Sequence, residues 1–295
     1  MTELERRYRW LLRAYPPGYR ADYEDELLDV LLATAGPGQA RPPLREVRAL
    51  LVGGIKARVI AAAQGPAWMD GLHLTVTVLS VLQLGVLIPY AGTIPLWVAL
   101  SALALLAVLR GRMWAALPLV AATGLKVVGV TYGEPWLDGT LLPVFPDRLW
   151  QAPALYGTGG PIAPSISYLV LFFCLAVLAI RGRPSRRRSW WWLLALPLVA
   201  GADPAWLDIA EGTSSSITRV GLEAALLAGA AYAGHLTGDA RWAVAAGVCL
   251  VPATAVLAEN VELASRQGVA HAALLILLTA TAAAVPFRAR RRILL

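Results

Sequence analysis

Eight apolar segments follow one another after residue 70, and they constrain the fold more than any other feature of the sequence. A helix needs about 20 predominantly apolar residues to cross the hydrocarbon core of a bilayer. The chain is 58% hydrophobic and 15% charged, whereas soluble domains carry about 25% charged residues. We therefore predict an all-α polytopic membrane helix bundle. The predicted spans are residues 71–91, 93–109, 113–132, 164–180, 189–203, 217–236, 242–258 and 270–287.

The fifth of these segments is short and ends at Asp203-Pro204, so a tilted or partly re-entrant helix is the alternative there. The basic residues agree with the remaining topology, because the positive-inside rule places Lys and Arg in cytoplasmic loops. With residues 1–64 in the cytoplasm, almost all of the 26 basic residues lie there or in predicted cytoplasmic loops. The exceptions are Lys126, Arg148, Arg219 and Arg266.

This charge distribution predicts a multi-pass protein with both termini in the cytoplasm. Arg-rich, Lys-poor composition with abundant Ala, Gly and Leu is typical of a GC-rich bacterial genome, so the expected location is a bacterial inner membrane. The net charge of +7 is accounted for by loop orientation, without direct binding of nucleic acid. The Arg runs at 181–188 and 288–292 are expected to anchor the loops, with anionic lipid contact as a second role.

Residues 1–64 are rich in charge, and we predict a cytoplasmic three-helix domain there, followed by the membrane bundle of residues 65–295. Thr2 and Glu5 form a capping-box pattern, so the first helix is expected to begin at Glu3. A second helix is expected from about Arg20 to Thr34, and a third after Pro42-Pro43. Apolar residues recur at helical spacing along these helices. The candidates for binding a protein partner on these faces are Tyr8, Leu12, Tyr15, Leu27 and Leu31.

Four sequence features of this domain carry a family resemblance: YRWLLRAYPPGYR, the acidic stretch EDELLDVLL, a Gly-Pro break, and PPLREVRALLVGG. Residues 3–60 resemble the helical prefix of many bacterial polytopic membrane proteins. They are also similar to HAAS-type signalling domains, which often occur beside PadR-type transcriptional repressors. The resemblance implies a regulatory or signalling context and a cytoplasmic transcriptional regulator as partner. It implies no catalytic residues.

Three interpretations of the N-terminal domain stay open. It is either a solvated helical cap that helps insertion and orientation, or an adaptor that recruits another protein. A basic helix on the membrane surface is a weaker third alternative, because acids and bases are interleaved along these sixty residues.

Two ionisable residues fall inside predicted spans, where charge is costly and often functional. Lys126 lies about 20 Å from the inner end of the third span at 1.5 Å per residue, and Glu223 lies at a similar depth in the sixth. We predict that they pair across the bundle. The pair would either fix helix packing or act in gating or transport. In the remaining alternative, Lys126 extends outward and makes no such contact.

The long exterior segment 133–163 is a second candidate site, because ordered loops of this length often bind a ligand or form a lid. Together with the exterior segment near residue 206 it is a candidate pocket for a small molecule or cation whose identity the sequence does not specify. The alternative is a cover that lies on the bundle. The pocket candidates are Trp136, Asp138, Trp206, Asp208 and Glu211.

Enzyme signatures are absent: the chain has no Walker A loop, no HExxH and no GxSxG. Cys174 and Cys249 fall in apolar runs, and the three histidines lie near span ends, so neither a metal site nor another cofactor is expected. The predicted function is an integral membrane sensor or regulator that is not an enzyme. The rival predictions are a small-solute transporter or permease component that uses Lys126 and Glu223, and a scaffold with neither activity.

Overall fold

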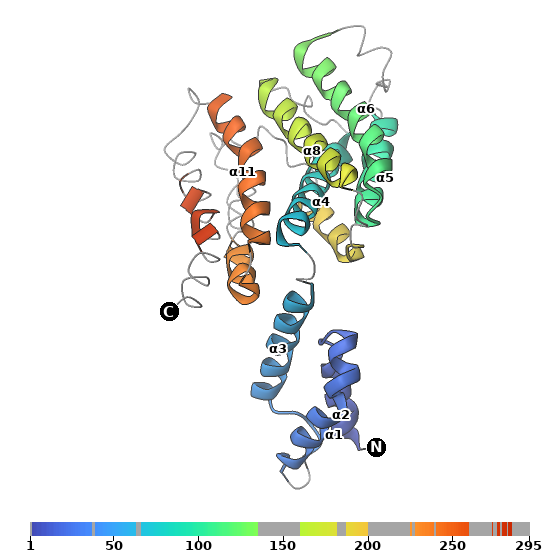
Figure 1. Cartoon of the computed structure of the whole chain (residues 1–295). Helices are drawn as coiled ribbons and strands as arrows, with labels where there is room; N and C mark the ends of the chain where they lie inside the picture. Colours follow the sequence, from blue (N-terminus) through green and yellow to red (C-terminus); the bar gives the residue numbers. More distant parts are fainter. Residues whose placement is uncertain are drawn as a thin grey trace, which may run out of the picture. The chain divides into compact units, whose positions relative to one another are not determined.

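The computed structural model describes residues 2–36, 39–62, 66–134, 160–181, 187–199, 228–238 and 240–259, with residues 225, 273, 276–277, 279–281 and 283–284. Every regular element within these ranges is a helix, so the all-α prediction is confirmed for them (Figure 1). The chain divides into two compact units, Met1–Gly65 and Pro66–Leu295. They are named the N-terminal unit and the C-terminal unit.

The N-terminal unit contains three helices, α1 (Glu3–Leu12), α2 (Pro17–Ala33) and α3 (Leu44–Ala62). The Thr2 hydroxyl accepts a hydrogen bond of 3.2 Å from the backbone N–H of Glu5, which confirms the predicted start of α1. Helix α2 begins at Pro17, earlier than expected from the sequence. Proline fits the first turn of a helix because its missing N–H would have no partner there.

Helix α1 packs against both α2 and α3 around one small core. The core residues are Leu4, Tyr8, Leu11, Leu12, Leu28 and Leu50. Glycine in the middle of α3 allows the close approach of α1, since a Cβ at Gly54 would lie 2.7 Å from the Cβ of Ala14. The guanidinium of Arg58 donates hydrogen bonds to the carbonyl oxygens of Arg13 and Ala14, which satisfies the C-terminal end of α1.

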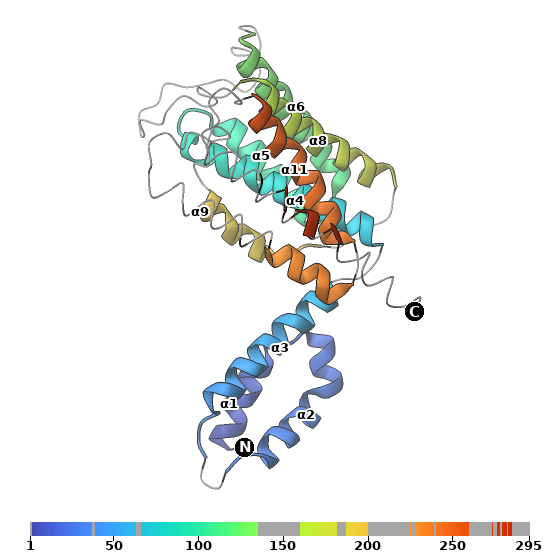
Figure 2. The same ribbon diagram turned by 90° about the vertical axis from the view of Figure 1, so that its left-hand side faces the viewer.

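The C-terminal unit is built around α4, which contacts α5, α8, α9 and α11 (Figures 1 and 2). In the most apolar stretch of α4, 78% of the residues are buried inside the protein, whereas in α6 and in α8 the corresponding share is 44%. The elements of this unit whose bounds the structure gives are α4 (Ala67–Leu87), η1 (Ile88–Tyr90), α5 (Pro95–Leu109), α6 (Met113–Tyr132), α8 (Ile162–Ile180), η2 (Trp190–Ala195), α9 (Leu196–Val199) and α11 (Arg241–Glu259).

Three of the described helices are long and apolar enough to cross a membrane, Ala67–Tyr90, Met113–Tyr132 and Ile162–Ile180. They coincide with the predicted spans 71–91, 113–132 and 164–180, and they indicate membrane association. The predicted spans 93–109 and 242–258 correspond to apolar helices that are shorter, Pro95–Leu109 and Arg241–Ala255.

The other three predicted spans are described only in part. The segment 189–203 opens with a 3-10 helix, Trp190–Ala195, and continues as α9 to Val199, where the described residues stop. Much of 217–236 and of 270–287 lies outside the described residues.

Candidate functional site

The residues predicted to bind a partner surround the core of the N-terminal unit. Tyr8 and Leu12 are fully buried, and Tyr15, Leu27 and Leu31 are half-buried beside them. A unit of three short helices has few apolar side chains, and most of those on α1 are needed to close its interior. A protein partner cannot reach Tyr8 or Leu12 while this core is intact.

Tyr8 also carries a buried polar contact, because its hydroxyl donates a hydrogen bond to the carboxylate of Glu46 on α3. Burial, and then the hydrogen bond to Glu46, raises the pKa of Tyr8 to about 12. The contact joins α1 to α3.

The raised pKa of Tyr8 predicts that the N-terminal unit loses stability in alkali. The folded state holds the Tyr8 proton more tightly than the unfolded state, whose tyrosine titrates near 10. Stability from this group is therefore complete below about pH 10 and is lost as the pH rises toward 12. Alkaline unfolding of the wild type and of Tyr8→Phe, followed by hydrogen exchange in α1, checks this. A steeper alkaline loss in Tyr8→Phe than in the wild type would contradict it.

A ladder of tyrosines runs from the α1–α2 turn onto the outer face of α2. The ring centroids of Tyr15 and Tyr19 are 5.0 Å apart, and those of Tyr19 and Tyr23 are also 5.0 Å apart. Tyr15 packs against the core, whereas Tyr23 is 48% exposed. Tyrosines at i, i+4 and i+8 were the available signal for this exposed ladder.

Acidic side chains flank the tyrosine ladder on the exposed side of α2. Among the described residues, no ion pair forms at Asp22, Glu26 or Asp29. The arginines of α1 pair with other acids: Arg6 and Arg7 pair with Glu3, and Arg9 pairs with Glu5 at 3.2 Å. Arg9 also lies 3.9 Å from Glu24 and from Asp25 on α2. The result is an aromatic surface surrounded by negative charge, which we call the α2 surface. It comprises Tyr19, Asp22, Tyr23, Glu26, Asp29 and Val30.

Lys126 lies on α6 in the interior of the C-terminal unit, and it is 0% exposed. This burial excludes the alternative in which the side chain extends outward to the surface. Its predicted partner Glu223 lies outside the described residues, so the pairing stays a prediction. One turn earlier on α6, the Thr123 hydroxyl is also buried and donates to the Leu119 carbonyl at 3.0 Å.

A polar layer crosses the bundle interior near Thr123. The side chains of Trp97, Ser101 and Thr123 approach the hydroxyl of Tyr168 from α5 and α6. In the described part of the chain, the indole N–H of Trp97 and the hydroxyls of Ser101 and Tyr168 have no hydrogen-bond partner. Lys126 lies on α6, as Thr123 does, and its ammonium is also buried. With these donors it makes the interior between α5, α6 and α8 more polar than the interior of a purely apolar helix bundle.

A charged cluster that sequence reasoning missed joins three distant segments at one end of the C-terminal unit. Asp70 in the first turn of α4 accepts hydrogen bonds from Arg188 at 2.6 Å and from Arg241 at 2.7 Å. The side chains of Asp70, Arg188 and Arg241 are 12%, 14% and 4% exposed. The partners are 118 and 171 residues apart from Asp70 along the chain, so no local pattern indicates their contact.

The exterior candidates Trp136, Asp138, Trp206, Asp208 and Glu211 all lie outside the described residues. Another acid, Glu259, is described at the end of α11. Its carboxylate accepts hydrogen bonds of 2.8 Å from the backbone N–H groups of Ile162 and Ala163. Glu259 therefore caps the first turn of α8, where negative charge is favoured by the helix dipole.

The described residues contain no group of three or more His, Cys, Asp or Glu that could hold a metal ion. His73, near the start of the predicted span 71–91, is buried in α4, where its Nε2 lies 3.0 Å from the carbonyl oxygen of Val108. Cys174 is buried and Cys249 is half-buried, and neither forms a disulfide.

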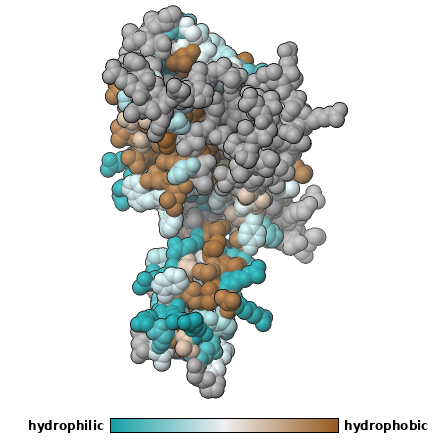
Figure 3. Space-filling model, turned by 180° about the vertical axis from the view of Figure 1, so that it is seen from behind, coloured by the Kyte–Doolittle hydropathy of each residue, from teal (hydrophilic) through white to brown (hydrophobic). Residues whose placement is uncertain are grey.

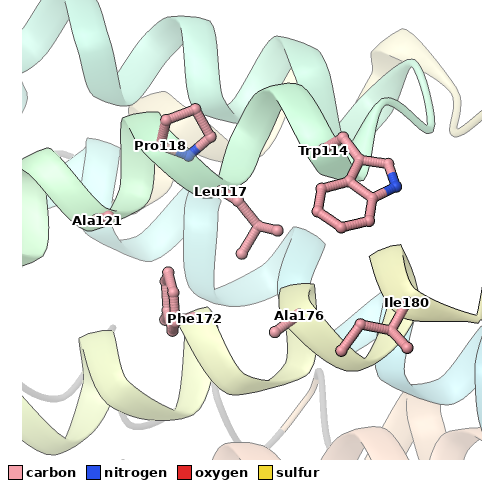
Figure 4. Close-up of a pocket in the computed structure, with 7 residues that line it drawn as sticks. All are labelled: Trp114, Leu117, Pro118, Ala121, Phe172, Ala176 and Ile180. Atoms are coloured by element: carbon pink, nitrogen blue, oxygen red, sulfur yellow. The ribbon is translucent and has the colours of Figure 1, made fainter.

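An apolar groove of about 340 Å³ lies between α6 and α8 (Figure 4). The ring of Pro118 and the small side chains of Ala121 and Ala176 leave this space open. The lining is Trp114, Leu117, Pro118, Ala121, Phe172, Ala176 and Ile180. All these side chains suit contact with hydrocarbon, and none offers a group for catalysis or for binding a charged ligand.

Comparisons with family models, with curated proteins and with solved structures find no match for this chain. The resemblance of residues 3–60 to helical prefix and HAAS-type domains therefore stays a prediction from the sequence motifs.

Proposed function

We propose that this chain is an integral membrane sensor or regulator whose N-terminal helices lie in the cytoplasm and engage a soluble protein. The observation that carries the proposal is the α2 surface, where Tyr19, Tyr23 and Val30 are exposed although the unit's core is already closed by other residues. Exposed aromatic side chains contribute a large share of binding energy at protein interfaces. The resemblance to PadR-associated domains favours a transcriptional repressor of that type as the partner.

The acids of the α2 surface favour a partner with a basic, partly apolar face. Asp22, Glu26 and Asp29 would accelerate association with such a face and would disfavour acidic partners. They also disfavour direct contact of this surface with nucleic acid, whose phosphates are repelled by carboxylates.

We further propose an eight-span topology with both termini in the cytoplasm. Support comes from the arginines that end or begin described helices. Arg188 and Arg241 meet at Asp70, and the guanidinium of Arg110 lies 4.7 Å from the ring centre of Trp190. These residues from four different segments gather at one end of the unit, as residues at a common cytoplasmic interface would.

Site-specific photo-crosslinking in the full chain tests the proposed partner. A photoreactive amino acid at position 23 should form an adduct with a cytoplasmic transcriptional regulator, whereas the same group at exposed Trp10 on α1 should not. Tyr23→Ala should weaken binding of that regulator roughly 30-fold, the effect of losing an aromatic hot spot of about 2 kcal/mol. Equal adducts at both positions, or none at position 23, would rule out the α2 surface.

A second candidate function is transport of a small solute, and the full burial of Lys126 beside a polar layer favours it. The two functions separate on deletion of residues 1–64. Deletion abolishes partner binding if the chain is a regulator, and it leaves transport largely intact if the chain is a permease component.

A further inference from the structure

Helix α3 exposes an apolar face that its own unit does not cover. Leu44 is 87% exposed and Ile55 is 60% exposed. At 100° per residue Leu44 and Ile55 lie within about 20° of each other and about 80–140° around the helix from Leu50 and Gly54, which face α1. The exposed apolar residues of α3 are Leu44, Leu51, Val52, Ile55 and Ile60. Figure 3 shows apolar and hydrophilic residues side by side on one face of the N-terminal unit.

The charges on this exposed side of α3 are all positive. Arg45, Arg48 and Lys56 are exposed there, and among the described residues none of them forms an ion pair. The one acid of α3, Glu46, is turned inward and accepts the hydrogen bond from Tyr8. Acids and bases that are interleaved in the sequence are thus separated by the fold, which removes the main objection to a membrane-surface helix.

The chain itself holds α3 close to a bilayer. Helix α3 ends at Ala62 and the first membrane-length helix begins at Ala67. Five residue-to-residue steps separate Ala62 from Ala67, so these helix ends lie at most about 18 Å apart, at 3.3–3.6 Å per residue. The C-terminal end of α3, with Ile55 and Lys56 about two turns before it, is therefore held near lipid headgroups whenever Ala67–Tyr90 crosses the membrane.

We propose that α3 lies on the bilayer surface, with Leu51 and Ile55 inserted at the level of the headgroups and with Arg45, Arg48 and Lys56 contacting anionic phospholipid. A basic amphipathic helix binds membranes through buried apolar area and attraction to anionic lipid. The long basic side chains reach phosphate from the edges of the apolar face. This surface is distinct from the α2 surface, so it does not depend on a soluble partner.

The test places a fluorescent label on the exposed face of α3 in the full chain, reconstituted in nanodiscs. A single cysteine at Ile55 is labelled in a background with Cys174→Ala and Cys249→Ala, and a cysteine at Val30 on the exposed side of α2 is the matched control. Brominated phospholipid should quench the label at position 55 but not at position 30. A water-soluble quencher should show the reverse order.

The charge dependence gives a second readout. In nanodiscs that contain anionic lipid, the triple variant Arg45→Gln, Arg48→Gln and Lys56→Gln should lower the equilibrium constant for binding of α3 to the bilayer surface by about 100-fold. Each base contributes roughly a factor of five to this constant near an anionic surface. These side chains are exposed, so the fold should be unaffected. Equal lipid quenching at both positions overturns the proposal. The proposal is also overturned if the label at position 55 is shielded from the water-soluble quencher only when two chains share a nanodisc. That result would mean that a second copy of the chain covers this face.

Discussion

Replacement of Asp70 by asparagine is expected to lower the melting temperature of the chain in detergent by roughly 6–12 °C. The substitution removes the carboxylate that Arg188 and Arg241 share at 2.6 and 2.7 Å, and it leaves two largely buried guanidinium groups close together. Breaking a buried ion pair from one side costs about 3 kcal/mol, and 1 kcal/mol corresponds to roughly 2–4 °C in a unit of this size. Thermal unfolding followed by fluorescence measures the shift in melting temperature.

Two further variants identify the cause of this loss. Asp25→Asn, at a side chain that is 92% exposed, should leave the melting temperature unchanged. Arg241→Gln combined with Asp70→Asn should be less damaging than the sum of the single changes, because both single changes break the same Arg241–Asp70 ion pair. Strict additivity would show that the carboxylate and the Arg241 guanidinium do not interact.

Replacement of Gly54 by valine is expected to open the N-terminal unit and to increase amide exchange in α1 by roughly 100-fold. A Cβ at this position would lie 2.7 Å from the Cβ and 2.9 Å from the backbone carbon of Ala14. Backbone cannot move aside as a flexible side chain can, so α3 must shift away from α1. Overpacking of this kind costs about 1–3 kcal/mol, and 2.7 kcal/mol corresponds to a factor of about 100.

The control for this substitution is Gly18→Ala in the first turn of α2. No atom lies within 4 Å of a Cβ built at Gly18, and alanine favours the helix over glycine by up to about 1 kcal/mol. Exchange in α1 should therefore be unchanged or slower. If Gly54→Val exchanges like the wild type, the packing of α3 on α1 does not depend on glycine at this position.

Local patterns predicted local structure well in this chain. The capping box at Thr2 and Glu5 correctly located the start of α1, and length with hydropathy located the three membrane-length helices. The same patterns could not say what covers a helical face. Tyr8 and Leu12 share a stripe that would suit either a partner or an internal core, and the structure uses it as the core.

The candidate sites show the same division between local and distant information. A lysine inside an apolar span is easy to recognise in a sequence, so Lys126 could be predicted as a candidate site. The structure buries its side chain completely. The cluster at Asp70 could not be found this way, because Asp70 lies at the edge of a predicted span, and Arg188 and Arg241 resemble the other arginines that precede predicted spans. Contacts over more than a hundred residues require the tertiary arrangement itself.

The cluster at Asp70 also has a consequence for biosynthesis. The ribosome makes Asp70 long before it makes Arg241, and at 5–20 residues per second this interval lasts about 10–30 s. During that time α4 can enter the membrane but cannot form its contact with α11. Final closure of the bundle is therefore a late event in translation, and a chain released before residue 241 would lack the carboxylate bridge that joins α4 to α11.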